Sequence, residues 1–143
     1  MVLERQRRLT SIRPKILVTR RLPEPVEQRM ATLFEARFNA DDAPYAASTL
    51  VEALAGCEVL VSSITDRLDA ELISQLPPSV KLIAQFGNGF DNIDIEAAYA
   101  AGLIVTNTPS VLTEDTADMA MMLMLALPRR LTEGAELLPR HGT

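Results

Sequence analysis

The sequence predicts an α/β fold built on a parallel sheet, because short apolar runs alternate with helix-like segments along the chain. Continuous apolar strands of this kind are typical of a parallel sheet that is covered on both faces. The five runs are Lys15–Thr19, Glu35–Phe38, Val59–Val61, Leu82–Phe86 and Leu103–Thr106. Five strands joined by helices predict a flavodoxin-like, doubly wound five-stranded parallel sheet with the strand order 2-1-3-4-5.

Capping and breaking residues predict the helices between these strands. The first starts at Pro23 and Pro25 and runs to about Leu33; the second is capped by Ser48 or Thr49 and ends at Gly56; the third is Ala70–Leu76, capped by Asp69; the fourth is Ile95–Ala101, stopped by Gly102. Asp91 and Asp94 stand just before the fourth helix. We expect them to cap or stabilise that helix rather than to act as a catalytic pair.

Composition sets limits on the function. The 143 residues are about the length of one domain, and the apolar share of 48% and charged share of 23% are ordinary for a globular protein. A net charge of −5 gives a nucleic-acid surface no support. Cys57 and His141 are the sole residues of their kinds, so neither a disulfide nor a cysteine- or histidine-rich metal site is expected.

The compartment is expected to be the cytoplasm, since one cysteine is easiest to place in a reducing environment. Residues 1–13 are predicted to be a flexible arm; a mitochondrial presequence is the alternative, which Glu4 and the poor serine content disfavour. We find no apolar run of the roughly 20 residues that a membrane-spanning helix needs. A soluble protein with no membrane partner is predicted.

The segment Gly87-Asn88-Gly89 follows the fourth predicted strand and is the main candidate for a binding site. Its glycines allow positive φ, and its backbone N–H groups can face a carboxylate or phosphate. Ligands in open α/β sheets lie at the carboxyl ends of strands, so Ser62-Ser63 and Asn107-Thr108 are expected at the same edge. A plain tight turn is the alternative. A dinucleotide fingerprint is excluded, because its third glycine would fall at Asn92.

A last helix is predicted to begin at Thr113, with acidic residues in its first turn. From Met119 to Leu127 it reads MAMMLMLAL, without a polar residue, and Pro128 is expected to kink or end the run. A helix that is apolar all round must be buried on every side. A second domain or second subunit would bury it; a central core position is the alternative.

Three motifs in register carry a family resemblance: QFGNGFDNID, AAGLIVTNTPSVLTEDTAD and LALPRRLTEGAELL. The chain resembles the NAD(P)-dependent D-2-hydroxyacid dehydrogenases, and among them the glyoxylate/hydroxypyruvate reductases. The resemblance implies a two-domain enzyme, of which residues 14–109 form the flavodoxin-like substrate domain without its C-terminal return. Residues 110–143 then form the start of a Rossmann domain that binds NAD or NADP.

The resemblance also implies roles for particular residues. Gly87, Asn88 and Gly89 match the loop that binds the carboxylate of a small 2-keto or 2-hydroxy acid through backbone amides, although Asn88 often is Val in the family. Thr113 matches a position beside the nicotinamide of the cofactor. The helix around Met119 to Leu127 resembles the dimer helix of the family and implies a homodimer.

Other parts of the family's machinery are expected further along a full-length chain. These parts are the glycine-rich pyrophosphate loop and the catalytic Arg, Glu and His. No catalytic residue is therefore assigned to this chain, which is expected to bind no cofactor tightly and to be inactive alone. Two alternatives stay open: a non-catalytic small-carboxylate-binding or dimerisation module, and an unrelated flavodoxin-like or response-regulator domain, which the lack of an acidic cluster after the first strand disfavours.

Overall fold

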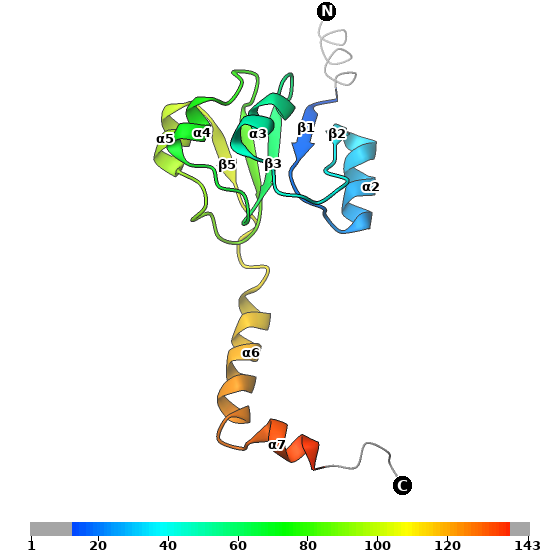
Figure 1. Cartoon of the computed structure of the whole chain (residues 1–143), viewed down its shortest axis with the longest axis vertical. Helices are drawn as coiled ribbons and strands as arrows, with labels where there is room; N and C mark the ends of the chain where they lie inside the picture. The colour runs from blue at the N-terminus through cyan, green and yellow to red at the C-terminus, as the bar shows by residue number, and fades with distance from the viewer. Residues whose placement is uncertain (1–12, 138–143) are drawn as a thin grey trace, which may run out of the picture. The chain divides into compact units, whose positions relative to one another are not determined.

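The computed structural model describes residues 13–137 (Figure 1). The strands are β1 (Lys15–Val18), β2 (Glu35–Arg37), β3 (Val59–Ser63), β4 (Leu82–Phe86) and β5 (Ile104–Thr106). The helices are α2 (Glu24–Leu33), α3 (Ala47–Ala53), α4 (Ala70–Ser74), α5 (Ile95–Ala100), α6 (Thr113–Ala126) and α7 (Leu131–Glu136). The predicted strands are all present within one or two residues. The predicted arm, 1–13, lies outside the described residues except for its last position.

The strands form one sheet in the order β2-β1-β3-β4-β5, and every neighbouring pair is parallel. This confirms the predicted flavodoxin-like order. One row across the sheet aligns Leu17, Leu60, Ile83 and Val105. These side chains all lie on one face, where α3, α4 and α5 cover them and form the larger core.

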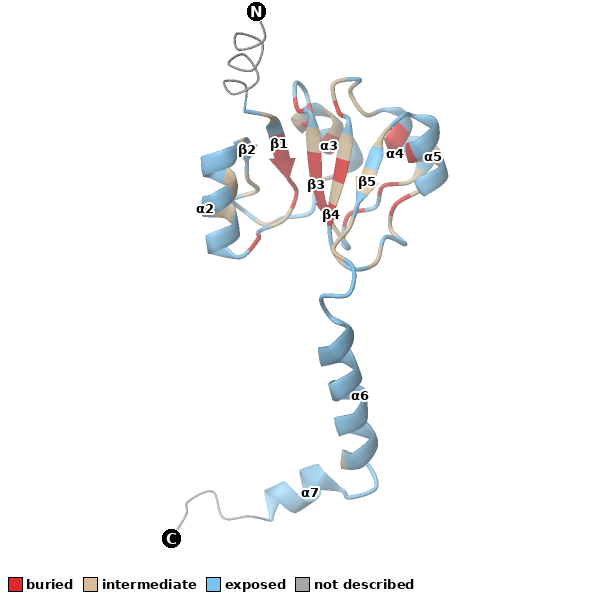
Figure 2. Cartoon of the chain, turned by 180° about the vertical axis from the view of Figure 1, so that it is seen from behind, coloured by how far each residue is buried: buried red, intermediate tan, exposed pale blue. Residues whose placement is uncertain are grey.

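The opposite face is covered over only part of its width. Ile16, Val18 and Val61 are buried there against the residues of α2 and the segment that follows it. Figure 2 views this face with α2 beside β1 and β2, and no helix of the unit that ends at Thr108 lies over β4 and β5. The side chains of Phe86 and Ile104 are accordingly 46% and 63% exposed. We call the exposed side chains of Phe86 and Ile104, together with the half-buried Leu82, the open strip.

Two of the three predicted side-chain caps are present. The carboxylates of Asp69 and Asp94 accept hydrogen bonds from the N–H groups of Leu72 and Ala97, which confirms both as caps. The predicted cap at Ser48 or Thr49 is wrong. Helix α3 begins after Ala46, so both residues lie inside its first turn, and no side chain caps it.

The described residues divide into two units, one up to Thr108 and one from Pro109 onward. Helix α6 begins at Thr113 as predicted and ends just before Leu127 and Pro128. None of the residues of α6 is buried. Within its own unit the helix is therefore not the core helix that the alternative interpretation expected. Helix α7 was not predicted. Among the described residues, no helix is long and apolar enough to cross a membrane.

An ion pair ties the end of β1 to the loop after β2. The guanidinium Nε of Arg20 donates to Asp42 Oδ1 at 2.9 Å, and the backbone N–H of Arg21 donates to the same oxygen at 2.8 Å. The hydrogen bond from Arg20, followed by that from Arg21, lowers the pKa of the Asp42 carboxyl to about 2. Asp42 holds this place with a φ of 53°, a conformation that Asp and Asn tolerate better than most residues.

The substitution Asp42→Asn should lower the free energy of unfolding at neutral pH and remove part of its pH dependence. A carboxyl with a depressed pKa contributes stability that is present above its unfolded pKa, near 4, and is lost as the pH falls through about 2. The difference between wild type and variant should therefore shrink between pH 4 and pH 2. Urea unfolding at pH 7, 4 and 2 measures it.

Asp41→Asn is the matched control, since Asp41 is the exposed neighbour in the same loop. A difference between wild type and Asp42→Asn that is the same at all three pH values would contradict the assignment.

Candidate functional site

The loop Gly87-Asn88-Gly89 leaves the carboxyl end of β4 as predicted, but its glycines serve a different purpose. Neither glycine has a positive φ; in the described residues Gly56 and Gly102 do. A Cβ at Gly87 would lie 2.6 Å from Cγ2 of Ile64, in the loop after β3, and a Cβ at Gly89 would lie 3.3 Å from Asp91 Oδ2. Glycine at 87 thus permits the close approach of the two loops, and the expectation that a positive φ explains the glycine is wrong.

All three carbonyl oxygens of this loop are held by donors of the protein. Gly87 O accepts from the N–H of Thr108 at 3.0 Å, Asn88 O from Asn107 Nδ2 at 2.8 Å, and Gly89 O from Gln85 Nε2 at 3.3 Å. In a trans peptide the C=O of one residue and the N–H of the next point in opposite directions. The N–H groups of Asn88, Gly89 and the following residue are therefore directed away from these donors.

A buried amide network lies beneath the loop. Gln85 is 2% exposed; its Oε1 accepts from Ser62 Oγ at 2.7 Å, and its Nε2 donates to Asn92 Oδ1 at 2.8 Å. Asn92 Nδ2 donates in turn to the carbonyl oxygens of Ser63, at 3.1 Å, and Asp66, at 2.7 Å. The network joins the loops that follow β3 and β4 into one body.

A carboxylate ties the end of β1 to the same edge. Asp66 is 8% exposed, and its Oδ2 accepts from Thr19 Oγ1 at 2.5 Å and from the N–H of Ser63 at 2.7 Å. The prediction that Ser62-Ser63, the glycine loop and Asn107-Thr108 share one edge is therefore confirmed. Ser62 itself is buried and bonded to Gln85, so it faces the sheet and not a ligand.

Sequence reasoning missed Gln85, Asn92, Asp66 and Thr19 as parts of this edge. A signal was present for Gln85, because it is the one polar residue in the apolar run of β4. Cys57 is fully buried in the larger core, as expected of a packing residue, and Arg37 Nη2 donates to its sulfur at 2.7 Å.

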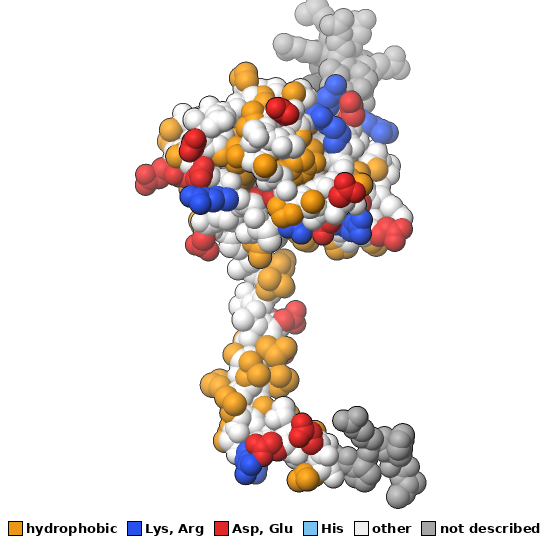
Figure 3. All heavy atoms as spheres, in the orientation of Figure 1, with side chains coloured by type: hydrophobic (Ala, Val, Ile, Leu, Met, Phe, Trp, Pro, Cys, Tyr) orange, Lys and Arg blue, Asp and Glu red, His pale blue; other side chains and the backbone are white. Residues whose placement is uncertain are grey.

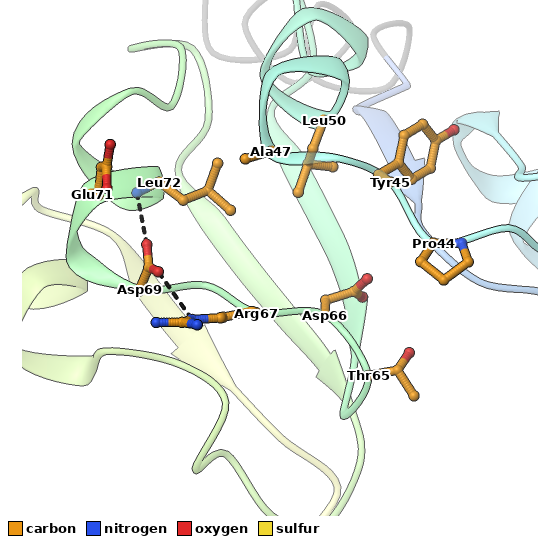
Figure 4. Close-up of a pocket in the computed structure, with 10 residues that line it drawn as sticks. All are labelled: Pro44, Tyr45, Ala47, Leu50, Thr65, Asp66, Arg67, Asp69, Glu71 and Leu72. Atoms are coloured by element: carbon orange, nitrogen blue, oxygen red, sulfur yellow. Dashed lines mark hydrogen bonds and ion pairs between the residues drawn. The ribbon is translucent and has the colours of Figure 1, made fainter.

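A hollow of about 450 Å³ lies beside this edge, between the segment before α3 and the segment that leads into α4 (Figure 4). Its wall includes Tyr45, Leu50 and Leu72 together with the acidic residues Asp66 and Asp69. The Asp69 carboxylate is already engaged, since it caps α4 and pairs with Arg67 at 3.1 Å. Gly87, Asn88 and Gly89 do not line this hollow, so it is separate from the candidate loop.

Neither a cluster of metal-ligating side chains nor the third glycine of a pyrophosphate loop is present in the part of the chain that the structure describes. No group of three or more His, Cys, Asp or Glu side chains within residues 13–137 is placed to hold a metal. The third glycine of a pyrophosphate loop is replaced by Asn92, whose amide fills the space between two loops. Helices α4 and α5 carry the Asp69 and Asp94 carboxylates at the ends where a phosphate would bind.

The other predicted site residue, Thr113, belongs to the second unit. It is the first residue of α6, is exposed, and makes no side-chain cap to the helix. Along the same helix, Met119, Met121, Met122, Leu123, Met124 and Leu125 are each about half exposed or more. Figure 3 shows these hydrophobic side chains gathered along α6.

Comparison with known proteins decides the family. The sequence model of the D-isomer specific 2-hydroxyacid dehydrogenase catalytic domain matches residues 16–136. The chain belongs to this family. It is 40% identical over 122 residues to a glyoxylate reductase of Korarchaeum cryptofilum. The aligned region covers 85% of this chain and 36% of that protein. It is 40% identical over 131 residues to a glyoxylate reductase of Thermococcus litoralis, which covers 92% of this chain and 39% of that protein.

Solved structures of similar fold agree with this family assignment. The NADPH-dependent glyoxylate/hydroxypyruvate reductase of Sinorhizobium meliloti, in complex with NADP and malonate, superposes with a TM-score of 0.68 at 31% identity. That match covers 87% of this chain and 39% of the other. A Thermus thermophilus protein superposes with a TM-score of 0.72 at 34% identity, covering 90% of this chain and 42% of the other. The chain thus spans about two fifths of the length of its relatives.

The substitution Gly87→Ala should destabilise the fold by about 1 kcal/mol, because the new methyl group meets Cγ2 of Ile64, and this exposed side chain has to leave its present rotamer to make room. Removing that methyl with Ile64→Ala should recover part of the loss. A double-mutant cycle on the free energy of unfolding in urea measures the coupling.

Gly89→Ala is the matched control in the same loop. Its Cβ contact is with the end of an exposed carboxylate side chain, so its cost should be the smaller of the two. Strict additivity of Gly87→Ala and Ile64→Ala would show that the two loops do not meet as described.

Proposed function

We propose that this chain supplies the substrate-carboxylate site of an NAD(P)-dependent D-2-hydroxyacid dehydrogenase of the glyoxylate/hydroxypyruvate reductase type. The observation that carries the proposal is the orientation of the loop at the end of β4. Its three carbonyl oxygens are bound to Thr108, Asn107 and Gln85, and the intervening N–H groups are directed the other way. Backbone donors arranged in succession are a recurrent way to hold an anionic group.

The substrate proposed is a small 2-keto acid, such as glyoxylate or hydroxypyruvate. Recognition through backbone N–H groups depends on the main chain, so the Asn88 side chain does not decide whether a carboxylate binds. Two observations support a carboxylate over a phosphate: the relatives at 40% identity are glyoxylate reductases, and the Sinorhizobium structure contains malonate, a dicarboxylate.

The proposed task of these residues is to bind and orient the acid, not to transfer hydride. Reduction of a keto acid needs a held cofactor and an acid/base group at the carbonyl oxygen. The position of Asn92 and the two capping carboxylates support the proposal that residues 13–137 do not hold a dinucleotide. We propose that NAD or NADP is held by a second domain in full-length relatives, with Thr113 near its nicotinamide end, and that this chain alone is inactive.

We also propose the two-domain organisation that the resemblance implies, with residues 14–109 as the substrate domain and 110–143 as the start of the cofactor domain. The open strip supports it. Parallel sheets are normally covered on both faces, whereas Phe86 and Ile104 are uncovered in the unit up to Thr108. A further segment, as in the longer relatives, would complete the cover.

A homodimer through α6 is the proposed assembly. The side chains of Met119, Met122 and Leu123 share one face of this helix, and each is about half exposed. Methionines suit an adaptable contact surface. The same observation favours one form of the alternative function, a dimerisation module without catalysis.

Titration with oxalate or glyoxylate tests the proposed site. In spectra of ¹⁵N-labelled protein, the amide signals of Asn88 and Gly89 should shift in a saturable manner at millimolar ligand, because these N–H groups would bond the carboxylate. Unchanged chemical shifts of the Asn88 and Gly89 amides at millimolar ligand would contradict the proposed function.

Two comparisons sharpen this experiment. The amides of Gly56 and Gly102, which lie at helix ends away from the loop, should not respond. The variant Asn88→Val should keep the response, since it alters a side chain and leaves the backbone donors. The same samples should show no sustained oxidation of NADH or NADPH with glyoxylate.

The variant Met122→Glu tests the proposed dimer. A charge placed in an apolar contact should weaken self-association by roughly 100-fold or more, as measured by sedimentation equilibrium. Leu131→Glu is the matched control, because Leu131 is exposed in the same unit but lies on α7. A monomeric wild-type protein, or equal effects of the two variants, would count against α6 as the dimer surface.

A further inference from the structure

We infer that Asn107 is a positioning residue that prevents the Asn88–Gly89 peptide from flipping, and so keeps the Gly89 N–H directed toward the substrate carboxylate. This inference rests on the proposed function of the loop and names what holds the loop in its binding orientation. Asn107 follows β5, and its half-buried side chain donates from Nδ2 to Asn88 O at 2.8 Å.

The Asn88–Gly89 peptide is the one in this loop most in need of such a restraint. A peptide flip reverses the C=O of one residue and the N–H of the next, and it changes φ of the second residue by about half a turn. Here the second residue is Gly89, which has no Cβ to oppose the new φ. The peptide after Gly89 leads into Phe90, whose side chain resists the same change.

A flip at this peptide would reverse the electrostatics of the site. The Asn88 carbonyl oxygen would take the place of the Gly89 N–H and would face an anionic carboxylate. The side chain of Asn107 opposes this because a flip would break its 2.8 Å hydrogen bond. The adjacent N–H of Thr108 bonds Gly87 O at 3.0 Å and keeps the segment after β5 alongside the loop.

Gln85 contributes less to this restraint. Its Nε2 reaches Gly89 O at 3.3 Å, which is a longer hydrogen bond. This bond acts on the Gly89–Phe90 peptide, whose flip the side chain of Phe90 already opposes. Its shorter bonds go to Ser62 and Asn92. Gln85 therefore supports the base of the loop, while Asn107 controls the flip.

The experiment measures oxalate affinity through the backbone amide of residue 89 in four variants of the whole chain. Asn107→Ala should raise Kd by roughly 2- to 10-fold, the worth of one hydrogen bond. Asn39→Ala is the matched control: Asn39 Nδ2 also donates to two backbone carbonyls, those of Thr19 and Ala43, both at 2.7 Å, but it holds a different loop. It should leave Kd unchanged.

A rescue separates control of the flip from general loosening of the fold. Gly89→Ala adds a Cβ that the present φ accepts with a small shift of Asp91, and it disfavours the flipped conformation. The double variant Asn107→Ala/Gly89→Ala should therefore bind oxalate more tightly than Asn107→Ala. Equal affinity of wild type and Asn107→Ala, or no rescue, would overturn the inference.

A second measurement needs no ligand. Relaxation dispersion of the Asn88 and Gly89 amides should show microsecond-to-millisecond exchange in Asn107→Ala, which Gly89→Ala suppresses. If wild type fails to bind oxalate but this exchange pattern is found, the proposed function falls and the restraint by Asn107 stands. If wild type binds and no exchange is found, the inference falls alone.

Discussion

The hydrogen bond between the side chains of Gln85 and Asn92 is the interaction on which the carboxyl edge of the sheet depends. It lies between a strand residue that is 2% exposed and a loop residue that reaches two carbonyl oxygens of the neighbouring loop. Each member satisfies the polar atoms of the next, so removing one amide would leave several buried groups without partners. The loop geometry at this edge therefore depends on the network.

The fold was predictable because its signals are local. The apolar runs that became β1, β3 and β4 are the continuous segments typical of a parallel sheet. Asp69 and Asp94 each stand directly before a helix, in the position of a cap. The cap of α3 was misplaced because Ser48 and Thr49 are plausible caps in sequence, while the turn actually starts after Ala46. Sequence alone does not decide between competing starts a residue or two apart.

The location of the candidate site was predictable from the sequence, but the contacts that shape it were not. The rule that ligands lie at the carboxyl ends of parallel strands located the glycine loop and Asn107 at one edge. The close contact of Gly87 is with Ile64, which is 23 residues earlier in the chain. A contact of this kind produces no periodic pattern in the sequence. The role of Asn107 likewise depends on a carbonyl oxygen in another loop. Long-range contacts of this kind have to be measured.

The open strip also bears on how the chain behaves among copies of itself. β5 is the last strand of the sheet, and it has three residues, none of them charged or proline. Lysine, proline and inward charges are the usual means by which an edge strand is protected from pairing with other chains. Beside this bare edge stand the exposed Phe86 and Ile104. These exposed apolar residues are thus a hazard for aggregation at high concentration, and a surface lysine at this edge would keep the chain dispersed.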